Sequence, residues 1–315
     1  MENKKHLNLR KVFITFLLFI IITSIISFLV NRTQKIDNND DVQKEEYDES
    51  LNEVQENNEV ENVINLNELS ETEGSFGIID KQVYKKSEKD IDLPLLIYHA
   101  FQTPEPADDK YKLFSTQERF EENVKTLIDA GYTFLTLEDI YKYNNGSLAL
   151  PEKNITITMD DGWLGCYTEA FPVLKKYNIP ATIFIVENLV GTEGYFNWEQ
   201  AKEMYDTGLV KIHVHGRKHI NATDYATKES LISDYNHTHE LIEEKLGANV
   251  QKIMAYPAGK SSEDTIAWLK EAGFEVQVQT KYGTINKSSS LDLTGLGRIR
   301  GEQATGKSIL SRLSK

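Results

Sequence analysis

Strand-like and helix-like segments alternate along most of this sequence, and the alternation limits the fold more than any other feature does. The first strand-like run spans residues 93–101, and in the stretch after it Phe120, Val124 and Leu127 recur at helical spacing. When a helix of ten or more residues connects two strands of one sheet, the connection is a right-handed crossover and the two strands lie parallel. About seven strand-like segments fall within residues 95–299, and no repeat of fixed period appears. We therefore expect one α/β domain whose parallel sheet is open or rolled into a barrel.

The charge of the chain is distributed unevenly. The net charge is −14, but residues 37–73 hold fourteen acidic residues and one basic residue, Lys44, so that this segment carries −13 and residues 74–315 only −6. A segment with few aromatic residues and a high net charge lacks the apolar surface to offset the entropy of ordering, which predicts a disordered stalk. The mildly acidic remainder has no excess of basic residues to neutralise phosphates, so we expect no nucleic-acid partner.

The N-terminal part contains one long apolar run. Residues 12–30 are about nineteen residues without a charge, which as a helix are just long enough to cross the hydrocarbon core of a membrane. Four Lys or Arg residues precede the run and only two follow it closely, which places the N-terminus in the cytoplasm and the rest outside the cell. The alternative is a cleaved signal peptide, but the run is longer than a usual signal core and no A-x-A-like site follows. The sequence predicts a cytoplasmic N-terminus (1–11), a transmembrane anchor (12–30), an acidic disordered stalk (31–90) and a globular domain (91–315).

Polar residues with catalytic or metal-binding chemistry lie where predicted strands end. Asp160 and Asp161 directly follow the strand at residues 155–159, His99 ends the first strand and His215 ends another. Tyr256 and Pro257 end a further strand. The carboxyl ends of parallel strands form the edge on which α/β folds build their sites. We therefore expect these residues to meet.

The spacing of two histidines points to a metal. His215 and His219 are four residues apart, so on a helical turn both imidazoles can face one ion, and a carboxylate from another strand completes a His-His-Asp site with open positions. Such a site suits zinc or a similar divalent metal, and the adjacent carboxylate can then act as a general base. Spacing does not decide which of Asp160 and Asp161 has which role. The alternative is that the aspartates cap the next helix and the histidines lie on an exposed turn.

Three segments together resemble a known family. The segments Thr158–Gly162, His215–His219 and Ala255–Gly259 are similar to the first three motifs of the polysaccharide deacetylases, also called carbohydrate esterase family 4 or the NodB-homology domain. The resemblance covers roughly residues 93–300 and implies a distorted (β/α) barrel of about seven strands. It also implies metal-dependent removal of acetyl groups from a polysaccharide, with Zn²⁺ as the expected metal and Co²⁺ or Ni²⁺ as alternatives. Under this resemblance Asp160 is the base, and the metal ligands are Asp161, His215 and His219.

The general acid is not where the family usually has it. Most members take this acid from a histidine on a strand near the C-terminus, whereas this chain has no histidine after His239. His99 follows Ile97 and Tyr98 on the first strand, and in a barrel the first and last strands are neighbours. The arrangement resembles a circularly permuted branch that includes poly-N-acetylglucosamine deacetylases, and this resemblance implies His99 as the acid. The alternative is a core histidine bonded to a backbone carbonyl.

The third motif also departs from the family pattern. Ala255 and Ala258 stand where the family usually has an arginine and an aromatic residue, so the charge partner of Asp160 is missing from its expected place. Arg298 or Arg300 is a candidate replacement. The backbone N–H of Ala258 remains able to donate to an oxyanion, since that role needs no side chain. Trp163 is placed to stack on a sugar or to pack in the core. The predicted substrate and oxyanion residues are Ala258, Pro257, Tyr256 and Trp163.

The remaining histidines and the cysteine are left outside the predicted site. We expect His213 to point away from His215 on its strand, and we place His237 and His239 on a charged helix. The single cysteine, Cys166, excludes a disulfide framework and a Cys-rich zinc site, and is expected to be a small buried residue.

Together these patterns predict a membrane-anchored, extracellular N-deacetylase. Its partner would be a polysaccharide that contains N-acetylglucosamine, either an exopolysaccharide or peptidoglycan. Two alternatives stay open: a non-catalytic glycan-binding protein on a degenerate barrel, and an esterase that removes O-acetyl groups from another glycan.

Overall fold

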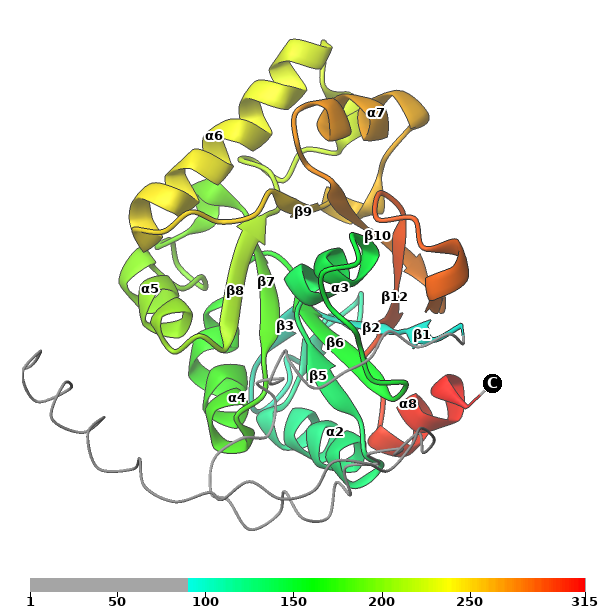
Figure 1. Cartoon of the computed structure of the whole chain (residues 1–315). Helices are drawn as coiled ribbons and strands as arrows, with labels where there is room; N and C mark the ends of the chain where they lie inside the picture. Colours follow the sequence, from blue (N-terminus) through cyan, green and yellow to red (C-terminus); the bar gives the residue numbers. More distant parts are fainter. Residues whose placement is uncertain (1–89, 315) are drawn as a thin grey trace, which may run out of the picture. The chain divides into compact units, whose positions relative to one another are not determined.

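A computed structural model describes residues 90–314, and its centre is a parallel β-barrel (Figure 1). Eight strands form one sheet in the order β2-β12-β10-β9-β8-β7-β6-β5, and a β2–β6 pairing closes seven of them into a ring. The predicted barrel is thereby confirmed, with the first strand next to the last as expected. The strands of the ring are β2 (Leu95–Tyr98), β6 (Asn154–Met159), β7 (Ala181–Ile185), β8 (Val210–Val214), β9 (Ile253–Ala255), β10 (Val276–Tyr282) and β12 (Leu296–Arg300).

The barrel strands are buried on both faces, which explains why they read as continuous apolar runs rather than as alternating ones. In β6 all six residues are buried. Side chains such as Leu95, Phe184 and Val276 pack together in one cluster, which fills the barrel. Their sequence neighbours, for example Leu96 and Ile183, belong to a second cluster between the strands and the outer helices. Residues two apart on a strand therefore share a face, and this rule fixes which side chains point into the barrel.

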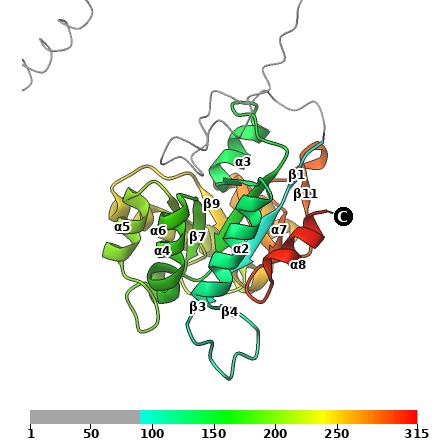
Figure 2. The ribbon, with the colours of Figure 1, turned by 90° about the horizontal axis from the view of Figure 1, so that it is seen from below.

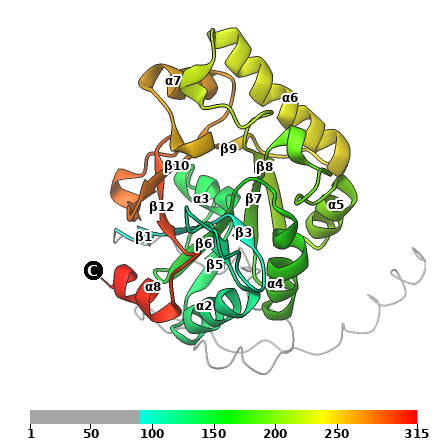
Figure 3. The ribbon, with the colours of Figure 1, turned by 180° about the vertical axis from the view of Figure 1, so that it is seen from behind.

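Helices cover the outside of the barrel and follow the predicted alternation with strands, except that β10 and β12 are joined by a segment without an α-helix (Figures 1 and 3). In α2 the predicted apolar stripe is buried at Phe120, Val124 and Leu127, and the side chain of Thr116 caps the N-terminus by accepting from the Arg119 N–H. The outer helices are α2 (Gln117–Asp129), α4 (Phe171–Tyr177), α5 (Trp198–Asp206), α6 (Lys228–Leu246), α7 (Glu263–Glu271) and α8 (Gly306–Leu313).

The two ends of the barrel are covered differently. Figure 2 shows α3 (Leu137–Asn144), which follows β5 (Thr133–Leu135), at one end and the short β3 (Ala100–Phe101) and β4 (Phe114–Ser115) at the other. Leu137 and Ile140 of α3 join the cluster inside the barrel, so α3 closes the end at which the strands begin. The strands finish at the opposite end, beside β3 and β4.

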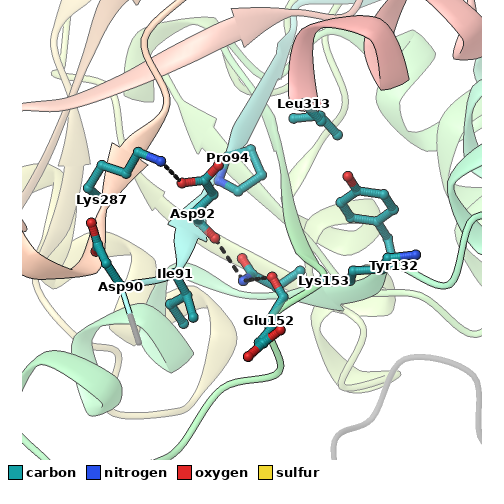
Figure 4. A pocket seen from close by; sticks show the side chains of 10 residues that line it. Asp90, Ile91, Asp92, Pro94, Tyr132, Glu152, Lys153, Lys287 and Leu313 are labelled. Carbon is teal, nitrogen blue, oxygen red and sulfur yellow. Dashed lines mark hydrogen bonds and ion pairs between the residues drawn. The ribbon is translucent and has the colours of Figure 1, made fainter. Parts of the chain in front are cut away.

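A polar cavity of about 380 Å³ lies at the end where the strands begin. Beside it β1 (Asp92–Leu93) pairs with β11 (Asn286–Lys287). Figure 4 shows Lys287 directed at Asp92, with which it forms an ion pair, and Lys153 donates to the Ala130 carbonyl. Because these charges are already paired and the cavity is at the closed end, it is separate from the site described below.

Two predicted regions lie outside the described residues. The expected anchor at residues 12–30 and the expected stalk at residues 31–90 fall before or at the start of this part of the chain. Within residues 90–314, none of the helices has the length and apolar character needed to cross a membrane.

Candidate active site

The polar residues predicted from the strand ends do meet at the end where the strands finish. His99 follows β2, Asp160 follows β6 and His215 follows β8. The residue before each of them (Tyr98, Met159 and Val214) belongs to the outer cluster, so by strand alternation each of the three continues the inward face. Arg298 of β12 shares this inward face and is completely buried. Parallel strands in register therefore gather one aspartate, two histidines and one arginine at the mouth of the barrel.

Asp161, His215 and His219 form a three-residue cluster with metal-ligand chemistry. Oδ1 of Asp161 lies 3.3 Å from Nε2 of both histidines, and the candidate ligand atoms all lie within 4.8 Å of one another. Nδ1 of His215 is 2.9 Å from the Ala255 carbonyl oxygen, which leaves its Nε2 facing the cluster. Oδ1 of Asp161 is buried and has no hydrogen-bond partner. A buried oxygen without a donor and two imidazole nitrogens aimed at it fit a divalent cation.

The electrostatics of Asp161 favour its ionised form. Burial alone would raise the pKa of this carboxyl, but the adjacent His215 and His219 outweigh burial and hold that pKa well below its ordinary value. Trp163 contributes from the next turn, because its indole N–H donates to Oδ2 of Asp161 at 3.0 Å. This bond fixes one oxygen of the carboxylate and leaves the other for the cluster.

The backbone at the site adopts unusual conformations. Among the described residues, five that are not glycine have positive φ, and three of these are Asp161 at 75°, His219 at 55° and Ala258 at 51°. Residues other than glycine rarely adopt this left-handed conformation. They keep it only where the surrounding contacts hold them, often at functional sites. No residue type or spacing at these positions predicts this strain.

Asp160 is held by Arg298 through two parallel hydrogen bonds. Nη1 and Nη2 of Arg298 each lie 2.6 Å from one carboxylate oxygen, and Nη1 also donates to the Thr158 hydroxyl. Burial alone would raise the pKa of Asp160, but Arg298 and the nearby imidazoles outweigh burial and lower it. Arg298, rather than Arg300, is therefore the replacement for the arginine missing from the third motif.

His99 is paired with Glu302, a residue that our reading of the sequence missed. Nδ1 of His99 lies 2.8 Å from Oε1 of Glu302, whose side chain is completely buried. Burial alone would lower the pKa of His99, but the hydrogen bond to Glu302 and the charges of Asp160 and Asp161 outweigh burial and raise that pKa. Glu302 follows the last strand, β12, so the strand-end rule that found the other residues also points to it.

The four residues predicted to contact the substrate or the oxyanion differ in how accessible they are. Tyr256 is completely buried and its hydroxyl donates to Gln277, so its side chain faces the outer helices and is not available to a substrate. Pro257 is buried and faces Gly216, while Ala258 is exposed. Trp163 stacks on Tyr195 with ring centroids 4.7 Å apart, at the edge of the metal cluster.

Of the three histidines left outside the predicted site, one is placed differently from our expectation. His213 lies on the same face of β8 as His215, because residues two apart on a strand must, and our expectation of opposite faces was wrong. It is buried inside the barrel, where burial lowers its pKa to about 3 and keeps the ring neutral. His237 and His239 lie on α6, as predicted. Cys166 is buried, and its thiol contacts the His99 carbonyl oxygen at 3.4 Å.

Comparisons with known proteins agree with this geometry. A family model described as polysaccharide deacetylase matches residues 148–277. The poly-beta-1,6-N-acetyl-D-glucosamine N-deacetylase of Staphylococcus aureus is 31% identical over 172 residues, which cover 51% of this chain and 59% of that protein.

Two solved structures extend the comparison to the fold. IcaB from Ammonifex degensii matches with a TM-score of 0.62 and 25% identity, covering 71% of this chain and 98% of that one. The Streptococcus pyogenes deacetylase PplD, solved with acetate, matches with a TM-score of 0.64 and 23% identity, covering 71% and 99%. At that identity the second match shows a common fold alone.

Proposed function

Because this chain belongs to the polysaccharide deacetylase family, we propose that it hydrolyses acetamide groups of N-acetylglucosamine units in a cell-surface polysaccharide and releases acetate. One observation carries the proposal. Beside the metal-ligand cluster, Asp160 is held in its ionised form by Arg298, while Glu302 raises the pKa of His99. Amide hydrolysis needs a base and an acid that are in opposite protonation states at the same pH, and these two pairings provide them.

The metal-ligand cluster supplies the remaining requirement. A divalent cation bound by Asp161, His215 and His219 would polarise the carbonyl and lower the pKa of a water molecule. We propose Zn²⁺, with Co²⁺ and Ni²⁺ as alternatives, because two imidazoles and one carboxylate suit these ions. The bonds from Trp163 to Asp161 and from His215 to Ala255 fix which atoms face the cation.

Asp160 acts as the general base in this proposal. It accepts a proton from the attacking water while the water oxygen adds to the carbonyl carbon of the acetamide. The two hydrogen bonds from Arg298 prevent the carboxylate from rotating, so the proton is accepted by an oxygen of fixed position. The backbone N–H of Ala258 is the proposed donor to the oxyanion that forms.

His99 acts as the general acid. The carbon–nitrogen bond breaks when His99 gives a proton to the departing nitrogen, which leaves acetate and a glucosamine unit. Glu302 holds the ring by Nδ1, so that Nε2 is the nitrogen left for this transfer. An amine is a poor leaving group without a proton, and the pairing of His99 with the buried Glu302 therefore supports an amide substrate over the O-acetyl ester.

The same pairs support an enzyme over a non-catalytic glycan-binding protein. Arg298 and Glu302 are both 0% exposed, and burying a charge is costly unless its partner is close. A protein that only binds glycans has no need to bury an arginine behind Asp160 and a glutamate behind His99. The altered third motif thus has its charge partner supplied from β12.

The location of the protein and the identity of the glycan are part of the proposal. The apolar run at residues 12–30 supports a single-pass membrane anchor with the barrel outside the cell. The similarity to a poly-beta-1,6-N-acetyl-D-glucosamine N-deacetylase supports an exopolysaccharide with that linkage, and peptidoglycan is the second candidate.

Acetate release by the full-length chain tests the proposal. The substrates are β-1,6-linked and β-1,4-linked N-acetylglucosamine oligomers, peptidoglycan and an O-acetylated glycan, each with and without a chelator. We expect acetate from an N-acetylated substrate, abolished by the chelator and restored by Zn²⁺. Release from the O-acetylated glycan alone would favour the esterase, and glycan binding without any acetate release would favour the binding protein.

A further inference from the structure

The loop between the two histidines of the metal cluster is held in place by a carboxylate that contacts neither of them. This carboxylate belongs to Glu187, in the short helical turn η3 (Glu187–Leu189) that follows β7. Its side chain is 7% exposed although it carries no role in the chemistry above. A nearly buried carboxylate is costly unless its partners are close, so its contacts indicate what it is for.

Glu187 joins the loop to helix α6 through both carboxylate oxygens. Oε1 forms an ion pair with Nε of Arg217 at 3.0 Å. Oε2 lies 2.8 Å from Nδ1 of His237 and accepts from the buried Thr238 hydroxyl at 2.9 Å. Arg217 is the central residue of the segment between His215 and His219, so one carboxylate ties this segment to α6.

Backbone hydrogen bonds reinforce the same connection. The N–H of Glu187 donates to the Gly216 carbonyl at 3.2 Å, and the N–H of Asn188 donates to the Arg217 carbonyl at 3.0 Å. The N–H of Arg217 donates to Oδ1 of Asp234, on α6, at 2.8 Å. Both polar groups of the Arg217 backbone are therefore fixed from outside the loop.

The loop needs this support because its conformation is strained. His219 has φ of 55°, a region that is unfavourable for residues other than glycine, whereas Gly216 adopts its φ of 78° without strain. A strained residue keeps its conformation only where neighbouring contacts hold it. Without them the loop would relax, and His219 would no longer be aimed at Asp161.

We propose that Glu187 is a positioning residue for the metal site, whose carboxylate holds residues 216–218 in the conformation that directs His219 at Asp161. The inference rests on the metal site of the proposed function and adds a residue to it. Groups behind the ligands commonly change metal affinity by about tenfold to a hundredfold when they are replaced. Glu187 would have this effect through the loop backbone, without contacting a ligand side chain.

The test is a titration of the metal-stripped full-length chain with Zn²⁺ against a chromophoric chelator. We expect Glu187→Gln to raise the Kd for Zn²⁺ by about tenfold to a hundredfold. The matched control is Asp139→Asn, which changes another nearly buried carboxylate, one that accepts from the N-cap residue Thr136 of α3 at the closed end of the barrel. We expect this control to lower stability and to leave the Kd unchanged.

A second variant keeps the proposal testable if Glu187→Gln folds poorly. Arg217→Leu removes the ion pair from its more exposed side, and we expect a smaller rise in Kd. In the double variant the two effects should be less than additive, because both changes break one interaction. Hydrogen exchange of the metal-free chain should also be faster at residues 216–219 in either variant.

The outcomes separate this inference from the function on which it rests. A wild-type chain that binds Zn²⁺ together with a Glu187→Gln chain of equal affinity would overturn the role of Glu187 and leave the metal site standing. An equal loss of affinity in Asp139→Asn would also overturn it, because the effect would then be general destabilisation. A wild-type chain that binds no Zn²⁺ would overturn both proposals.

Discussion

The two ends of the barrel are built from opposite kinds of interaction. At the end where the strands begin, α3 fills the barrel with apolar side chains such as Leu137 and Ile140, and the surface ion pair between Lys287 and Asp92 is exposed. At the end where the strands finish, Asp160, Arg298 and Glu302 are at most 1% exposed. The backbone strain at Asp161, His219 and Ala258 lies at the same end.

This difference shows that the closed end stabilises the fold, whereas the open end contains groups that are costly to bury. Apolar burial at the closed end stabilises the domain without requiring exact partners. Buried charges and left-handed residues at the open end are tolerated only while every partner is in place. Substitutions at the two ends should therefore have different consequences: loss of stability at the closed end, and loss of both stability and activity at the open end.

Arg298→Met should have the largest effect on stability. It leaves the Asp160 carboxylate buried without its partner, so we expect a loss of about 3 to 5 kcal/mol in the free energy of unfolding. The pKa of Asp160 should rise at the same time, because burial then acts unopposed by the guanidinium. Denaturant unfolding measures the loss, and an unchanged midpoint would show that the pair does not hold this end together.

Ile140→Ala tests the closed end by removing apolar volume from α3. We expect a loss of about 2 to 4 kcal/mol in the free energy of unfolding, since a cavity is left in the barrel. The kcat per folded molecule should be unchanged, because Ile140 packs in the apolar cluster on α3, at the end of the barrel away from the site. A fall in kcat for the folded enzyme would mean that the two ends are not independent.

Glu302→Gln changes the protonation of His99 at the open end and leaves the shape of the site nearly the same. Glutamine carries no negative charge, so the pKa of His99 should fall. The general acid must be protonated to act, and so activity should be lost at lower pH than in the wild type. We expect kcat to drop by about tenfold at alkaline pH, a part of the 10²–10⁴-fold that a general acid contributes. A pH–rate profile whose alkaline limb does not move would exclude the pairing as the cause.

Lys287→Ala should have almost no effect. It removes an ion pair in which both side chains are well exposed, and such pairs contribute little to stability. We expect the thermal midpoint and the rate of acetate release to match the wild type. A clear change in either would show that the cavity beside Lys287 matters to the protein.

Much of the fold and the site follows from the sequence because parallel strands end on one edge. That rule found His99, Asp160, Asp161 and His215, and the four-residue spacing added His219. The same rule applied to the last strand points to Glu302, which our prediction did not include. Strand alternation likewise places Tyr256 on the outer face and His213 on the inner face.

Other features of the site were outside the reach of sequence patterns. Arg298 and Arg300 share one face of β12, so strand alternation cannot separate them. Only the three-dimensional structure shows that Arg298, and not Arg300, lies close enough to pair with Asp160. The contact between Glu187 and Arg217 joins two segments that no short sequence motif contains together. The left-handed conformation of His219 depends on that packing and has no signature in residue type.

The proposed mechanism gives the adjacent Asp160 and Asp161 different roles, one as a base and one as a metal ligand. Asp160→Asn and His215→Ala should be compared by metal content and by acetate release from N-acetylglucosamine oligomers. We predict that Asp160→Asn keeps about one metal ion per chain and loses nearly all activity, roughly 10²-fold or more, whereas His215→Ala loses both. Full activity in Asp160→Asn, or loss of its metal, would show that the two aspartates do not divide these roles.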